Sequence, residues 1–70
     1  MPVPTRIYAR AKRAVWRHIF NMNHNRGGMI TRRRGDRRAA YIATRYVRSI
    51  NGQRVVYRLA NSMARSRRYR

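Results

Sequence analysis

The chain has 70 residues, which is enough for one small domain, and its 19 basic residues stand against a single acidic one, for a formal net charge of +18. It contains no cysteine, so a disulfide scaffold of the secreted type is excluded. No run of about 18 apolar residues occurs, and we therefore expect no membrane-spanning segment. Hydrophobic residues nevertheless make up 43% of the chain, more than a disordered polycation would carry. This combination predicts short helices with apolar faces that fold fully only against a polyanion.

Residues 1–5 are predicted to form an extended lead-in, because Pro2 and Pro4 restrict the backbone around them. Thr5 is the expected N-cap of a first helix over residues 6–24. Apolar residues recur in this helix at steps of three and four, which is typical of a helix with one buried face; they are Ile7, Ala11, Ala14, Val15, Ile19 and Met22. A second stripe at helical spacing consists of Arg6, Arg10, Arg13 and Arg17.

Residues 6–20 are amphipathic, bear arginines and lack acids. That composition resembles a mitochondrial transit peptide. Two interpretations stay open at this point, a retained targeting signal and a helix that binds RNA.

Residues 25–35 are predicted to form a basic loop. Gly27 and Gly28 supply the geometry that ends a helix, and the cluster Arg32-Arg33-Arg34-Gly35-Asp36-Arg37-Arg38 places five arginines within seven residues. Asp36 is expected to cap the next helix and to pair with its neighbouring arginines. One carboxylate cannot neutralise this cluster, so we expect an external phosphate backbone, to which arginine offers planar bidentate donors.

A second helix is predicted over residues 36–51 and is expected to end at Asn51-Gly52. Its apolar positions at helical spacing are Ala39, Ile42, Ala43, Tyr46 and Ile50. A third helix over residues 53–64 would carry Val55, Val56, Leu59 and Met63 on one side. The alternative is a β-hairpin, because Asn-Gly is a strong hairpin signal between strand-forming residues, whereas the alanines favour helix. Residues 65–70 are expected to be a basic tail.

The predicted fold is therefore mainly α, with two or three short helices, extended basic termini and no large independent core. We expect no enzymatic activity, cofactor, metal or small-molecule substrate. Asp36 is the lone acid, and His18 and His24 lack the further ligands or the oriented partner that a metal site or a catalytic triad needs.

Basic density with interleaved aromatic residues is the strongest functional signal. Aromatic rings stack on unpaired bases, and arginine binds phosphates or stacks. Tyr69 in the tail is the best stacking candidate, while Trp16 and Tyr46 could equally fill the core. The candidate RNA-binding residues are Arg6, Arg10, Arg13, Arg17, Arg26, Arg32, Arg33, Arg34, Arg37, Arg38, Arg45, Arg48, Arg54, Arg58, Arg65, Arg67, Arg68, Tyr69 and Arg70.

Taken whole, the chain resembles the small arginine-rich ribosomal proteins. The segment Ser49-Ile50-Asn51-Gly52-Gln53-Arg54-Val55-Val56-Tyr57-Arg58 is similar to the second-helix segment of the very small two-helix protein of the bacterial large subunit. The segment Gly28-Met29-Ile30-Thr31-Arg32-Arg33-Arg34 is similar to basic segments of two short small-subunit proteins. The resemblance implies short helices with basic tails that thread between rRNA helices and neutralise phosphates.

The expected function is that of a structural constituent of a ribosome, with rRNA and neighbouring ribosomal proteins as partners and no membrane. The expected location is a mitochondrial ribosome or otherwise a cytoplasmic one. A protamine-like or viral-core protein that compacts DNA is the alternative, although such chains are usually poorer in apolar residues. A membrane-active basic peptide is a third possibility that suits only residues 6–20.

Overall fold

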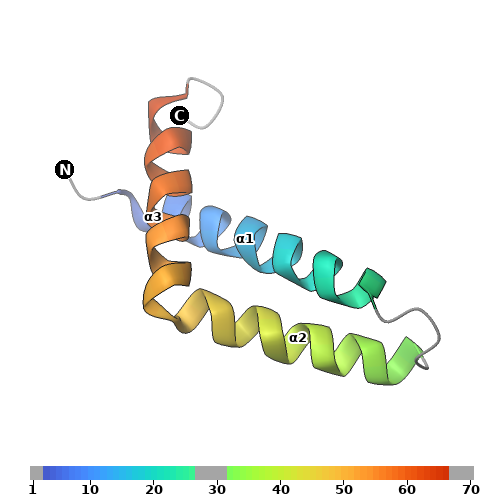
Figure 1. Ribbon diagram of the computed structural model, residues 1–70. Coiled ribbons are helices and arrows are strands. Elements are labelled where there is room, and N and C mark those ends of the chain that lie inside the picture. The colour runs from blue at the N-terminus through green and yellow to red at the C-terminus, as the bar shows by residue number, and fades with distance from the viewer. Residues whose placement is uncertain (1–2, 27–31, 67–70) are drawn as a thin grey trace.

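A computed structural model describes residues 3–26 and 32–66, with side chains over residues 3–24 and 36–66. Within these ranges the chain forms three helices and no strand: α1 (Thr5–Arg26), α2 (Arg32–Arg48) and α3 (Ile50–Arg65). The predicted mainly α fold is confirmed, and the hairpin alternative around Asn51-Gly52 is wrong. α1 and α2 lie side by side and antiparallel, and α3 turns away from the end of α2 and crosses the N-terminal half of α1 (Figure 1).

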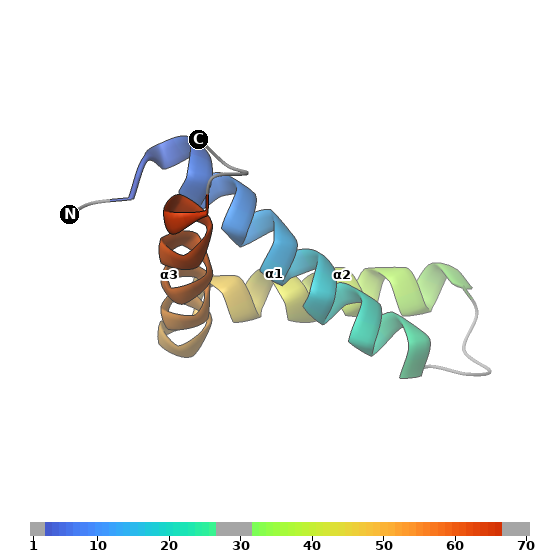
Figure 2. The same ribbon diagram turned by 90° about the horizontal axis from the view of Figure 1, so that it is seen from above.

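The inner faces of the helices follow the predicted periodicity and meet in a small core. Its buried hydrophobic residues are Ala11 and Val15 of α1, Ala39, Ala43 and Val47 of α2, and Val56, Ala60 and Met63 of α3. Half of this set is alanine, which allows the helix axes to approach closely. The molecule measures 44 × 24 × 15 Å, and a helix with its side chains is about 10–12 Å across. Few side chains can therefore lie far from solvent. The view from above shows α3 beside the N-terminal half of α1 (Figure 2).

The start of α2 differs from the prediction. Arg32 to Gly35 were expected in a loop and Asp36 at an N-cap, but the helix begins at Arg32 and Asp36 lies inside it. Arginine is a good helix former, and one glycine costs a helix only about 1 kcal/mol. The predicted helix boundary at Gly35-Asp36 is therefore wrong. α1 begins at Thr5, whose predecessor Pro4 accepts the first backbone hydrogen bonds, so Thr5 is a helical residue rather than the cap.

Ser49 ends α2 and starts α3, in place of the predicted end at Asn51-Gly52. Its backbone is extended, with φ −74° and ψ 161°. Its hydroxyl donates to the carbonyl oxygen of Tyr46 at 2.5 Å and accepts from the amide of Gly52 at 3.0 Å. One side chain thus satisfies backbone groups of both helices, as a serine N-cap can. Since one residue separates the two helices, the chain changes direction sharply here (Figure 1).

Gly52 lies in the first turn of α3 and is buried against the end of α2. A Cβ atom at this position would overlap the carbonyl oxygen of Tyr46 and come within 2.6 Å of its carbonyl carbon. The obstacle is backbone, which cannot rotate away as a side chain can. Glycine is required for close approach of α3 to α2, not for the turn that the sequence suggested.

Gly52→Ala is therefore expected to destabilise the fold by about 1–3 kcal/mol, the usual cost of overpacking. Thermal unfolding followed by circular dichroism, in salt that screens the arginine repulsion, measures this. Asn51→Ala is the matched control, since Asn51 is the exposed neighbour in the same turn. Equal melting temperatures for the two variants would contradict the close approach described above.

Candidate nucleic-acid interface

The side of α2 that points away from the core carries cations and a tyrosine. Ala39, Ala43 and Val47 are four residues apart and turn inward. The same periodicity turns a second set outward, here called the α2 face: Arg37, Arg38, Tyr41, Arg45 and Arg48, all exposed. Tyr41 is 64% exposed, and Nη1 of Arg45 donates to its hydroxyl at 3.4 Å. The α2 face thus offers guanidinium donors on both sides of an accessible aromatic ring.

A shallow depression of about 540 Å³ lies on the C-terminal half of the α2 face; Tyr41, Thr44, Arg45, Arg48 and Ser49 line it. The hydroxyl of Thr44 already accepts a hydrogen bond of 3.0 Å from the indole nitrogen of Trp16. The charged donors that line this depression are Arg45 and Arg48. Guanidinium groups beside an open ring can bind phosphate oxygens while the ring stacks on a base.

The outer face of α1 is also cationic. Arg6, Arg10, Arg13 and Arg17 are all exposed, in the predicted stripe opposite the buried Ala11 and Val15. Lys12 is exposed as well and was left out of the predicted set. The positive charge of Lys12 is the one sequence feature that marks it as a candidate, because the residue does not share the helical spacing of the arginine stripe.

α3 turns Arg54, Arg58 and Arg65 to solvent. Beside them Tyr57 is 52% exposed, and its ring lies 4.9 Å from that of Tyr8 on α1. This tilted pair links α3 to α1 and leaves part of the Tyr57 ring accessible. Every arginine whose side chain is described is thus exposed, on all three helices.

Asp36 does not neutralise these cations. Its Oδ1 atom lies 2.8 Å from Nδ1 of His24 on α1. The expected pairing with Arg37 or Arg38 is not found, and the side chains of Arg32 to Arg34 lie outside the described set. The histidine nitrogen is buried without an aligned hydrogen bond. Among the described side chains, no arginine forms an ion pair with a carboxylate.

Three stacked rings of α1 form contacts between α1 and α2. Trp16, Phe20 and His24 stack along α1, with centroids 5.2 and 5.4 Å apart. The first ring donates to Thr44 and the last lies against Asp36, so both ends of the stack contact α2. Trp16 and Tyr46 are half-buried against the core, which resolves the two alternatives for them in favour of packing.

Several predicted site residues are not placed by the structure. The backbones of Arg26 and of Arg32 to Arg34 belong to helices, but their side chains lie outside the described set. The tail candidates Arg67, Arg68, Tyr69 and Arg70 lie outside the described residues altogether, as do Gly27 and Gly28.

The described residues hold no group of three or more His, Cys, Asp or Glu side chains that could bind a metal ion. His18 is exposed on α1, and His24 faces Asp36. None of the described helices is long and apolar enough to cross a membrane.

Comparison with known proteins found no matching family model, no matching curated protein and no matching solved structure.

The α2 face predicts the salt dependence of polyanion binding. Replacing Arg37, Arg45 and Arg48 together by glutamine removes three charges, and each phosphate contact on a single strand contributes about 0.7 to the slope of log affinity against log salt concentration. We therefore expect the slope to fall by about two. Fluorescence anisotropy with a labelled single-stranded RNA at several salt concentrations measures it.

Lysine replacements at the same three positions are the matched control and should keep the slope, because they keep the charge. If both triple variants retain the parental slope, the α2 face does not contact phosphates.

Proposed function

We propose that this chain is a structural RNA-binding protein of a ribosome, which neutralises rRNA phosphates and stabilises rRNA packing. The observation that carries the proposal is the distribution of charge. Every arginine whose side chain the structure describes lies on an outer helix face without a carboxylate partner, while the inner faces form a small core. A chain of net charge +18 needs anions from outside.

Repulsion within the helices supports an external polyanion. Arg6 and Arg10, Arg13 and Arg17, and Arg54 and Arg58 are like-charged pairs four residues apart. Each such pair destabilises its helix by about 0.2–0.5 kcal/mol. Phosphates placed along these faces would turn the repulsion into attraction, and binding would then stabilise the fold by mass action.

The folded shape supports RNA over the compaction of DNA. Neutralising duplex phosphates requires charge and deformability but no exposed aromatic ring. Here Tyr41 and Tyr57 are exposed beside arginines, which is the combination that suits unpaired bases. The resemblance of the sequence to small arginine-rich ribosomal proteins is the reason for proposing that the RNA is ribosomal.

Crosslinking in the native host followed by sequencing of the attached nucleic acid tests the proposal. We expect crosslinks at a few discrete rRNA positions, and co-sedimentation of the chain with one ribosomal subunit through a high-salt wash. The arginine-to-lysine variant of the α2 face serves as the matched control and should remain bound. Crosslinks spread over genomic DNA, with release at moderate salt, would overturn the proposal in favour of DNA compaction.

The amphipathic α1 supports a mitochondrial setting for this ribosome, because its exposed cations and its lack of acids suit an import signal. The full chain with a fluorescent protein at its C-terminus is then expected to co-localise with a mitochondrial matrix marker. A purely cytoplasmic signal would remove the mitochondrial setting and leave the ribosomal role untouched.

A further inference from the structure

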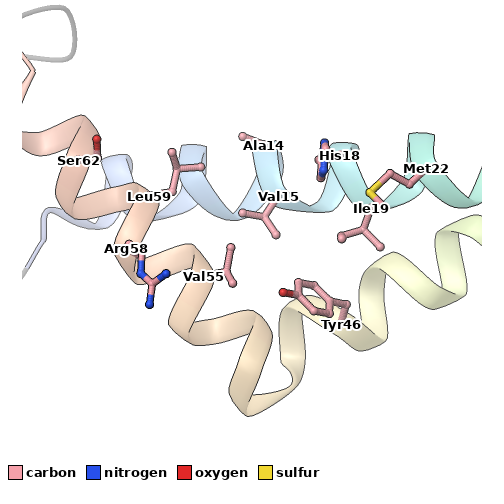
Figure 3. A pocket seen from close by; sticks show the side chains of 10 residues that line it. All are labelled: Ala14, Val15, His18, Ile19, Met22, Tyr46, Val55, Arg58, Leu59 and Ser62. Atoms are coloured by element: carbon pink, nitrogen blue, oxygen red, sulfur yellow. The ribbon is translucent and has the colours of Figure 1, made fainter.

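An apolar groove of about 610 Å³ opens in the corner where α3 leaves the α1–α2 pair, and we call it the corner groove (Figure 3). Apolar side chains from all three helices line it: Val15, Ile19 and Met22 of α1, Tyr46 of α2, and Val55 and Leu59 of α3. Met22 is 50% exposed and Val55 39% exposed. In so cationic a chain, this is apolar surface that the fold itself leaves uncovered.

The polar side chains at the edge of the corner groove are His18, Arg58 and Ser62. Within the described residues no carboxylate lies at this edge. The edge is therefore neutral or positive, and a partner with acidic residues beside its apolar anchors would complement it.

We propose that the corner groove binds an amphipathic helix of a partner protein, with apolar anchors at helical spacing and acidic residues on its flanks. A helix suits a groove formed between helices, since apolar anchors at positions i, i+3, i+4 and i+7 then enter together. The described residues contain no strand, so they offer no sheet edge for an extended peptide.

Other occupants fit the corner groove poorly. A second copy would bring a net charge of +18 against +18, and like charges across an interface are costly. A phosphate backbone would gain nothing from Val55, Leu59 and Ile19, which offer no donors. Arg58 at its edge apart, the arginines with described side chains do not line the corner groove, so the two surfaces can be occupied together.

The test uses the full chain and a fluorescein-labelled synthetic helical peptide with leucines at i, i+3, i+4 and i+7 and glutamates beside them. A second peptide of equal charge carries serine in place of the leucines. At about 0.5 M salt, where exposed charges are screened beyond about 4 Å, we expect the leucine peptide to bind and the serine peptide not to bind.

Val55→Glu should weaken the leucine peptide at least about tenfold, because it places a carboxylate in the apolar interface and against the glutamates. Ile50→Glu is the matched control: Ile50 is 72% exposed on the same helix, lies outside the corner groove, and brings the same change in charge. It should alter the affinity less than about twofold. Circular dichroism is expected to show equal helicity for both variants.

Equal binding of the two peptides, equal losses in the two variants, or no binding of the leucine peptide to the parent chain would overturn the proposal. So would a dimer in sedimentation equilibrium that Val55→Glu alone dissociates, which would make the occupant a second copy. RNA binding that Val55→Glu weakens and Ile50→Glu does not would assign the corner groove to nucleic acid instead.

Discussion

Like-charge repulsion between arginines acts on every helix of this protein, because 19 basic residues stand against one acid. Small helical domains often support their helices with ion pairs four residues apart, but this chain has a single acid to supply them. Asp36, the one acid, lies against His24 at the contact between α1 and α2. The compact state must therefore keep its cations on outer faces and hold together through its inner ones, and it gains when anions arrive.

Alanine makes up half of the buried hydrophobic residues on the inner faces. Ala11, Ala39, Ala43 and Ala60 are buried, so the helices can approach closely although little apolar volume is enclosed. Gly52 likewise allows a close approach where α2 meets α3, because it has no Cβ atom to overlap the backbone of Tyr46. Ser49 satisfies backbone groups of both helices there. The crossing of α3 over α1 thus depends on a few residues that contribute almost no side-chain volume.

This arrangement produces two surfaces of different chemistry on one small molecule. The outer faces present guanidinium groups with the accessible rings of Tyr41 and Tyr57, whereas the corner groove presents Val55 and Leu59. α3 contributes to both: Val55 and Leu59 line the groove, and Arg58 lies at its edge, next to the cationic face that Arg54 and Arg65 share. A chain that neutralises nucleic acid on one side and holds a protein helix on the other would join two components of an assembly.

The sequence by itself determined which residues face inward and outward, since the helical spacing of Ala11, Val15, Val56 and Met63 against the arginines depends only on the geometry of a helix. It misplaced the boundaries at Gly35-Asp36 and at Asn51-Gly52, because the same residues act as turn signals in isolation and as helical residues when a neighbouring helix packs against them. Tertiary structure alone decided that Trp16 binds Thr44, that Gly52 permits close approach, and that the corner groove exists. Each of these depends on how different helices pack against one another, and the periodicity within a single helix does not encode that packing.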